Sequence, residues 1–411
     1  MRKSARVLHL RNGFASALSG ASCLLVLVLA SCATDPHRAG EGVPDWGTET
    51  AVTPPPQAPA PPLAPEPIPE PPPPLPPPAP TNEVVEGWVP LGSWCKSIGV
   101  PAPCQVAVGP SPAYALSTTN GTFVLRIGMR TAYWDGLEFQ LGFAPQMAAG
   151  QPFVHALDLE KTLQPLVGGA PMSFLKTNPT IVIDPGHGGD DSGTKSVLGN
   201  HYEREYTLDW ARRLGALLAA NGWQVFLTRS NDVHLSLSNR VAFAEEHKAG
   251  LFLSLHFNSA GSSSRQAGLE TYCLTPTGMF STVTRGYDDD PALVFPNNAF
   301  DAENMQLAAW LHRALLQVNG RNDRGVRRAR YLSVLRAQNR PAILVEGGYL
   351  SNPLEARRIA DPAYRQRMAE AVAKALTEKC DVRSLKPVVQ AQKAEASGQR
   401  SEAMSTSIQS P

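Results

Sequence analysis

The stretch Ile181-Val-Ile-Asp-Pro-Gly-His187-Gly-Gly189 joins a short apolar run to a glycine-rich turn. Its β-branched residues favour a buried strand, and the glycines after it permit tight turning of the backbone. His187 therefore stands where a strand is expected to end. A single histidine in such a place is more often a hydrogen-bonded structural residue than a metal ligand, so other segments have to decide its role.

Apolar strands and amphipathic helices alternate through residues 178–381. A helix is expected to begin near Glu203, because its apolar residues recur at helical spacing until Asn221-Gly222 closes it. Further stretches read as strands at 224–228, 251–255, 269–272, 331–335 and 342–345, and as helices through 240–243, 305–316 and 364–376. This order predicts an α/β fold with a twisted, largely parallel sheet and helices on both faces. The carboxyl ends of such strands gather in one crevice.

Three other segments carry ionisable side chains at comparable places. They are Tyr202-Glu203-Arg-Glu205, Leu253-Ser-Leu-His256-Phe-Asn258 and Ile343-Leu-Val-Glu346-Gly-Gly348. Two histidines and a glutamate form the usual ligand set of a catalytic zinc, which leaves one position for water, and a further carboxylate beside that water can serve as its base. The four segments together predict a zinc hydrolase.

Several acidic residues compete for these roles. Glu203 and Glu205 both stand at the start of a helix, where the macrodipole also favours a carboxylate. Asp190 and Asp191 are loop residues that can reach a metal, although such residues are more often solvated or capping. Asp184 ends its strand and either holds the loop or hydrogen-bonds a ligand histidine.

Glu346 gives a sharper signal than these acids. It follows directly on the apolar run Ala342-Ile-Leu-Val345, where an ionised carboxylate would be an uncompensated charge at the edge of a core. We therefore expect Glu346 to have a chemical role.

The motifs of this region occur in a distinctive order: Asp184-Pro-Gly-His-Gly-Gly189, Glu203-Arg-Glu-Tyr-Thr-Leu208, Arg229 after Leu-Thr, Ser254-Leu-His-Phe-Asn258, Gly268-Leu-Glu-Thr-Tyr272, Asp323-Arg-Gly-Val326 and Pro341-Ala-Ile-Leu-Val-Glu-Gly-Gly-Tyr-Leu-Ser-Asn-Pro353. This order closely resembles the zinc-dependent N-acetylmuramoyl-L-alanine amidases of the type 3 family, which act in bacterial cell-wall remodelling. The resemblance covers about half of the chain.

The resemblance implies a site and a reaction. His187, Glu203 and His256 would bind one zinc ion per chain, and Glu346 would be the catalytic carboxylate. Glu203 is preferred over Glu205 because the family's glutamate stands five residues before the helix leucine, here Leu208. The implied reaction is hydrolysis of the amide between the lactyl group of N-acetylmuramic acid and L-alanine in peptidoglycan, during wall remodelling or daughter-cell separation.

Substrate contacts are expected from Asn258, Arg324 and Arg327. The two arginines belong to a basic cluster, residues 321–330, which either forms a solvated face paired with nearby acids or binds carboxylates of the peptide stem. The stretch Thr275–Pro296 is longer than the minimal family pattern. We expect it to border the cleft or to cover it, which leaves regulation of the site open.

Residues 1–31 have the layout of an export signal, with four basic residues before an apolar stretch. The tetrapeptide Leu29-Ala-Ser-Cys32 resembles a bacterial lipobox, which implies lipidation of Cys32 and anchoring to a membrane; the alternative is an ordinary cleaved signal. Ala33 in place of Asp resembles the pattern that directs lipoproteins to the periplasmic face of the outer membrane. Removing the signal changes the net charge from +1 to −3, which gives no electrostatic case for nucleic acid.

The rest of the chain predicts three further parts. Residues 32–83 are rich in proline and read as an extended, disordered stalk. Residues 84–172 show short alternating strands with Gly-bearing turns, which predicts a small β-rich α+β domain. Its order of strands, helix and hairpins resembles the copper amine oxidase N-terminal-like domain of exported bacterial proteins. Residues 382–411 form a small, polar tail that is expected to be disordered.

The cysteines give weaker information. Cys95 and Cys104 are close enough in sequence to bridge a small loop, and Cys273 and Cys380 form a second candidate pair that the sequence alone does not decide. No cysteine lies in a Cys-x-x-Cys pattern, so a structural thiolate zinc site is not expected.

Three functional hypotheses result. The first is a lipid-anchored periplasmic amidase with peptidoglycan as its substrate and a possible activator protein as its partner. The second is a catalytically silent lipoprotein that only binds peptidoglycan. The third is a zinc peptidase or deacetylase on the same scaffold.

Overall fold

The computed structural model describes residues 86–107, 111–168, 174–261, 265–319 and 322–377. The expected signal 1–31, the stalk 32–83 and the tail 382–411 lie outside these ranges, as do Cys32, Arg321 and Cys380. None of the helices in the described ranges combines the length and apolar content that a membrane crossing needs.

One eleven-stranded sheet dominates the structure, in the order β10-β9-β11-β14-β12-β13-β6-β5-β4-β3-β2. Its strands are β2 (Cys104–Val106), β3 (Ala113–Thr118), β4 (Gly121–Arg126), β5 (Thr131–Trp134), β6 (Leu137–Gln140), β9 (Thr180–Pro185), β10 (Gln224–Leu227), β11 (Leu251–Asn258), β12 (Leu269–Cys273), β13 (Asp323–Arg328) and β14 (Ala342–Tyr349). The strands β10, β9, β11 and β14 are mutually parallel; β12 is antiparallel to β14 and parallel to β13. The largely parallel sheet predicted for residues 178–381 is confirmed, and the antiparallel strands β2–β6 extend it into a mixed sheet.

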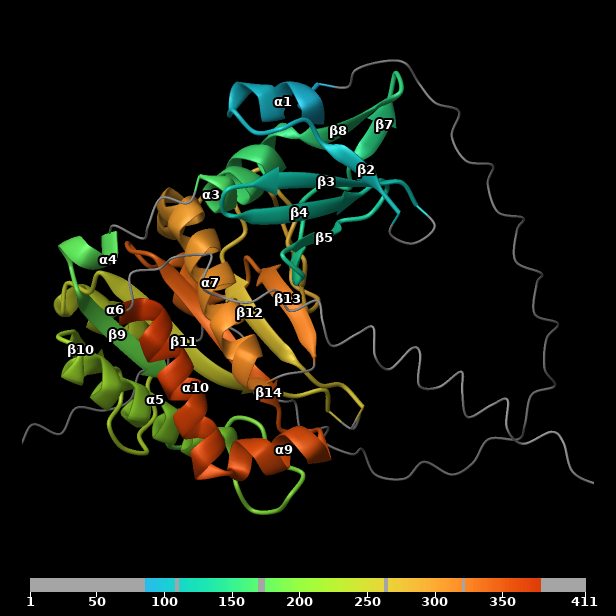
Figure 1. Ribbon diagram of the computed structural model, residues 1–411. Helices are drawn as coiled ribbons and strands as arrows, with labels where there is room; N and C mark the ends of the chain where they lie inside the picture. The colour runs from blue at the N-terminus through green and yellow to red at the C-terminus, as the bar shows by residue number, and fades with distance from the viewer. Residues whose placement is uncertain (1–85, 108–110, 169–173, 262–264, 320–321, 378–411) are drawn as a thin grey trace, which may run out of the picture. The chain divides into compact units, whose positions relative to one another are not determined.

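Helices cover both faces of the parallel half. The larger ones are α5 (Glu203–Ala220), α7 (Asp301–Asn319) and α10 (Pro362–Thr377), with α9 (Pro353–Ala360) beside α10. Figure 1 shows α5, α7 and α10 on one face of the sheet. The other face is covered by α6 (Leu237–Glu246) and α8 (Ser333–Arg336). Alternate residues of β9 point to opposite faces of the sheet. Ile181 and Ile183 lie in the hydrophobic cluster with α5, α7 and α10, whereas Val182 lies in the cluster with α6 and α8, as the two-residue period of a strand requires.

The amino-terminal part is rich in strands, as predicted. Besides β2–β6 it contains β1 (Trp88–Pro90), β7 (Gln146–Ala148) and β8 (Gln151–His155), which form a small separate sheet. Helix α1 (Leu91–Ser97) precedes β2, and α2 (Ala156–Asp158), the π-helical turn η1 (Leu159–Leu163) and α3 (Gln164–Val167) follow β8. A short helix α4 (Phe174–Thr177) leads into β9, and the 3-10 turn η2 (Pro296–Phe300) leads into α7.

The meander β2–β6 is hydrogen-bonded directly to the half that contains the parallel strands. Strand β6 pairs in parallel with β13 at Phe139 and Val326, and the amide of Glu138 donates to the carboxylate of Asp323 at 2.9 Å. One hydrophobic cluster contains side chains from both halves. The boundaries 84–172 and 178–381 remain predictions.

Residues 331–335 were expected to form a strand, and this prediction is wrong. The sequence Tyr331-Leu-Ser-Val-Leu leads into the short helix α8, while the strand of this region is β13, within the arginine cluster. Val326 is the one aliphatic side chain of β13, so hydrophobic patterning gave no signal there. Arg328 is nevertheless buried, because its guanidinium donates to the carbonyl of Lys161 at 2.7 Å.

Among the described cysteines, Cys95, Cys104 and Cys273 are all unpaired. Cys95 is buried in α1 and Cys104 is exposed in β2, so the suggested bridge between them is not formed.

Candidate metal centre

A buried charge pair holds the loop that carries His187. Asp184 accepts hydrogen bonds from Thr228 at 2.6 Å, Ser254 at 2.8 Å and Arg240 at 2.6 Å. Arg240 also donates to the carbonyl of His187 at 2.9 Å. Of the two roles considered for Asp184, the structure shows that of holding the loop. Burial raises the pKa of Asp184, but Arg240 and the hydroxyl donors outweigh this and lower it overall.

The backbone at His187 adopts the left-handed region, with φ of 61°. This conformation is uncommon for a residue other than glycine and occurs often at functional sites. The backbone before it also passes very close to the second histidine: a Cβ atom on Gly186 would lie 2.2 Å from the ring of His256. A glycine is therefore required at 186 to let the two histidines converge.

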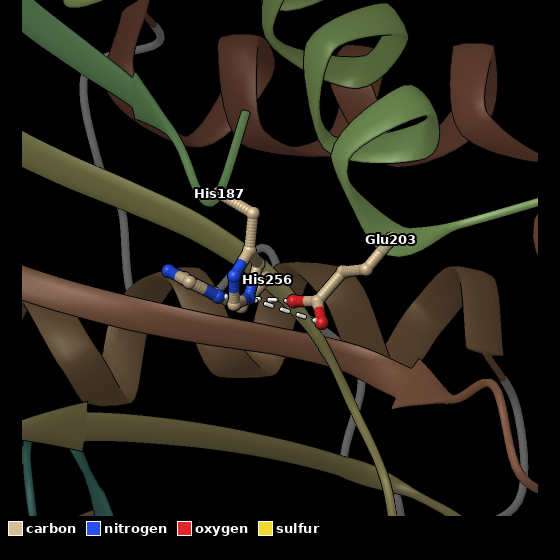
Figure 2. A group of neighbouring side chains, drawn as sticks. All are labelled: His187, Glu203 and His256. Atoms are coloured by element: carbon tan, nitrogen blue, oxygen red, sulfur yellow. Dashed lines mark hydrogen bonds and ion pairs between the residues drawn. The ribbon is translucent and has the colours of Figure 1, made fainter. Parts of the chain in front are cut away.

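The carboxylate of Glu203, the first residue of α5, lies between the two histidines. Its Oε2 is 3.1 Å from Nε2 of His187, and its Oε1 is 3.0 Å from Nδ1 of His256. One ligand atom from each of these residues lies within 4.8 Å of the other two. Figure 2 shows the three side chains converging on one point. Two imidazole nitrogens and one carboxylate oxygen fit a catalytic zinc ion with an open position.

The other acids of these segments have different partners. Asp191 accepts a hydrogen bond from Nδ1 of His187 at 2.8 Å, which leaves Nε2 directed toward Glu203. Such a partner fixes the tautomer and orientation of a ligand histidine. Glu205 instead caps the helix through the amide of Tyr202 and pairs with the exposed His201. The structure thus separates Glu203 from Glu205 on geometry.

The electrostatics of the cluster favour positive charge at its centre. Burial lowers the pKa of His187, but Glu203 and Asp191 outweigh it and raise that pKa to about 10. Burial raises the pKa of Glu203, yet the histidines bring it well below its ordinary value. The pKa of His256 is lowered, chiefly by burial. A divalent cation would satisfy the same field without needing the protons.

Glu346 lies in register beside this cluster. On β14 it pairs with His256 of β11 on one side and with Glu270 of β12 on the other. The side chain is buried, and its Oε2 has no hydrogen-bond partner. Burial and the charge of Glu203 raise the pKa of Glu346 to about 8. An unsatisfied buried carboxylate with this pKa is suited to accept and release a proton near neutral pH.

One pocket of about 130 Å³ collects these side chains. Its wall includes His187, Glu203, His256, Asn258, Arg285 and Glu346. Arg285 comes from the stretch Thr275–Pro296, which was expected either to border the cleft or to cover it. Its place in the pocket wall shows that the stretch borders the cleft.

Glu270 was not singled out by the sequence reasoning, although it lies in the quoted motif Gly268-Leu-Glu-Thr-Tyr272. Its buried carboxylate accepts from the side chains of Asn258 at 2.7 Å, Tyr272 at 2.8 Å and Arg324 at 2.7 Å. An acid within an otherwise apolar strand was the signal that could have found it.

Of the three residues predicted to contact the substrate, Asn258, Arg324 and Arg327, one lines the pocket and two do not. Asn258 lines the pocket and is oriented by Glu270, and Arg324 is paired with the same carboxylate. Arg327 faces the amino-terminal part, where its guanidinium lies 3.4 Å from Glu138, and it is not part of the pocket wall.

Comparison with known proteins shows which family has a similar sequence in this part of the chain. Residues 181–378 match the family model of N-acetylmuramoyl-L-alanine amidases. This part of the chain belongs to that family. The matched segment of the amidase family begins in β9 and ends just after α10, so it contains all three residues of the metal cluster and Glu346.

Two curated relatives carry the family's name. The chain is 35% identical over 195 residues to the N-acetylmuramoyl-L-alanine amidase LytC of Bacillus subtilis, which covers 47% of this chain and 34% of LytC. It is 29% identical over 238 residues to the amidase AmiC of Escherichia coli O6:H1, covering 52% of this chain and 56% of AmiC. The match therefore spans only about a third to about a half of each relative.

A solved structure of the amidase family also aligns. The catalytic domain of CwlV, an N-acetylmuramoyl-L-alanine amidase from Bacillus (Paenibacillus) polymyxa var. colistinus, is 33% identical, with a TM-score of 0.41, over 49% of this chain and 98% of that domain.

Proposed function

We propose that the protein is a zinc-dependent N-acetylmuramoyl-L-alanine amidase, which hydrolyses the amide between the lactyl group of N-acetylmuramic acid and L-alanine in peptidoglycan. The observation that carries the proposal is the convergence of His187, Glu203 and His256 within 4.8 Å beside the unpartnered carboxylate oxygen of Glu346. The match of the same segment to the amidase family supports this reaction over other hydrolyses.

His187, Glu203 and His256 would hold the zinc ion. A bound zinc supplies Lewis acidity to the scissile carbonyl and to the attacking water. Asp191 keeps the His187 ring in the tautomer that presents Nε2, and the Asp184–Arg240 pair keeps the backbone of that residue in place. Preorganisation of this kind lets the ligands form the site without rearrangement.

Glu346 moves the proton in this proposal. As the water oxygen bonds to the carbonyl carbon, the carboxylate accepts a proton from that water. It then gives the proton to the alanine nitrogen as the carbon–nitrogen bond breaks, because an unprotonated amide nitrogen is a poor leaving group. The products are the lactyl carboxylic acid of the sugar and the free amine of the peptide.

The test is mass analysis of purified peptidoglycan after digestion by the zinc-loaded protein. We expect stem peptides with a free L-alanine amine and intact glycan strands. Glu346→Gln should bind zinc as the wild type does and lose about 10²- to 10⁴-fold in kcat, the usual contribution of a positioned acid–base group. Full activity of Glu346→Gln would refute the assignment of the proton carrier, and fragments cut at another bond would refute the amidase reaction.

We further infer that the protein is exported and lipid-anchored through Cys32, with residues 32–83 as a spacer between membrane and wall. The lipobox-like tetrapeptide and the proline-rich composition support this inference. Cys32→Ala should move the protein from the membrane fraction to the soluble fraction. Retention of that variant at the membrane would contradict the anchor.

A further inference from the structure

We propose that Arg285 is a specificity-determining residue that binds a free carboxylate of the peptide stem next to the scissile amide. This inference rests on the proposed function and names a recognition element of the same site. It places a substrate contact in the stretch Thr275–Pro296 and not in the arginine cluster at 321–330.

The location of Arg285 is the first observation. Among the described residues that line the pocket, it is the one with a permanent positive charge; the others include the carboxylates of Glu203 and Glu346. In the proposed zinc-loaded site the ion offsets the charge of Glu203, so Glu346 is the carboxylate that repels an anionic peptide, and a guanidinium on the wall counters this repulsion. The planar guanidinium also matches the two oxygens of a carboxylate.

Arg285 is presented by a turn of unusual backbone geometry. Its own φ is 48°, and Gly286 follows with a φ of 81°. The guanidinium carbon lies 6.0 Å from the ring centre of Tyr331, and the next aromatic residue, Tyr287, stacks on that ring at 5.4 Å. The tyrosine pair thus supports the arginine at the edge of the pocket.

The stretch that carries Arg285 is held by hydrogen bonds on both sides of the turn, to β13 and to the residues just after it. Before the turn, the amide of Thr282 donates to the carbonyl of Arg328 at 2.8 Å. After it, Asp289 accepts from the amide of Ser281 at 2.6 Å and pairs with Arg330. The loop contains no helix or strand, and these contacts hold it in place. A residue that recognises a ligand needs such a fixed position.

The charge of Arg285 is secure. Arg285 is exposed at the edge of the pocket. A guanidinium keeps its proton at any pH at which a protein is folded.

The described arginines of the cluster at 321–330 lie in other places. Arg324 pairs with Glu270, Arg327 with Glu138 and Arg330 with Asp289. Arg328 is buried, and its guanidinium donates to the main-chain carbonyl of Lys161 and to the sulfur of Met279. None of these four lines the pocket.

The experiment compares two muramyl peptides that differ in one group: the carboxyl of the second stem residue is free in one and amidated in the other. The zinc-loaded full chain is assayed with both. We expect Arg285→Gln to lower kcat/KM about 10- to 100-fold more on the free acid than on the amide, because a charge-assisted hydrogen bond is lost only with the acid. A loss shared by both substrates reflects the effect of the Arg285 charge on the pKa of Glu346. Arg285→Lys should recover part of the loss.

Arg367→Gln, which removes an exposed arginine on α10, serves as the control and should match the wild type on both substrates. Equal losses of Arg285→Gln on the acid and the amide, or no loss on either, would overturn the carboxylate contact. Digestion of whole peptidoglycan by the wild type separates the two proposals. Failure to cut the wall at the lactyl amide overturns both, whereas cutting with no dependence on the carboxyl overturns this one alone.

Discussion

The two halves of the eleven-stranded sheet use their strands differently. Strands β9, β11 and β14 run parallel, and ionisable side chains near their carboxyl ends meet in one place, as with His256 and Glu346. The antiparallel strands β3–β6 bury an aromatic cluster in which Phe123 packs on Trp134 and Phe139. Parallel strands all end at the same edge, whereas neighbouring antiparallel strands end at opposite edges. Direction of the strands, more than membership of the sheet, decides where a site can form.

The largest expected effect comes from removing a ligand in the parallel half. His256→Ala should lose bound zinc and measurable hydrolysis together, because two donors no longer complete the ligand set. Zinc content after dialysis, measured by atomic emission, is the test. The control is His201→Ala, which removes an exposed histidine just before α5 and should keep zinc. Stoichiometric zinc in His256→Ala would show that the ion binds elsewhere.

A smaller effect on zinc binding is expected from breaking the Asp184–Arg240 pair, which holds the loop that carries His187. Arg240→Leu leaves Asp184 as a buried, uncompensated charge, which should lower the free energy of unfolding by about 3–5 kcal/mol. It should also weaken zinc binding about 10- to 100-fold, because the carbonyl of His187 loses its donor. Urea unfolding and zinc titration measure the two effects.

The double variant Asp184→Leu with Arg240→Leu sharpens that result. It removes both charges and should be less destabilised than Arg240→Leu alone. A double variant that is less stable than the single one would mean that shape, and not charge, dominates at this position.

The smallest effect on the site is expected from the antiparallel half. Phe123→Ala should lower the free energy of unfolding by about 3–5 kcal/mol through a core cavity, while zinc affinity of the folded protein stays unchanged. Val124→Ala, at the half-buried next position, should cost less stability. A tenfold change in zinc affinity in Phe123→Ala would break the comparison, because it would couple the aromatic core to the metal cluster.

The sequence predicted the parallel half well because its signals are local. The apolar runs of β9, β11 and β14 mark their own ends, and the side chains just beyond them had to converge if the strands were neighbours. The choice of Glu203 over Glu205 followed from a family resemblance, and the structure supplies its physical reason in the capping role of Glu205.

What the sequence did not reveal depends on distant partners. Strand β13 went unrecognised because its arginines are balanced by groups far away in the chain, such as Glu138 for Arg327. Arg285 and Glu270 were also missed. Arg285 lies in a stretch without periodicity, and Glu270 is stabilised by residues of two other segments, Asn258 and Arg324. Long-range ion pairs leave no pattern in a single sequence.

The pairing of β6 with β13 has a consequence for how the chain folds. Glu138 and Asp323 are 185 residues apart, so β6 cannot gain this neighbour until the chain is present as far as β13. Contacts of such sequence separation slow folding, and a strand that waits for its partner is an open edge that can join other chains. A fragment that ends before β13 would keep that edge exposed and should aggregate, which makes the presence of β13 a condition for the solubility of the amino-terminal strands.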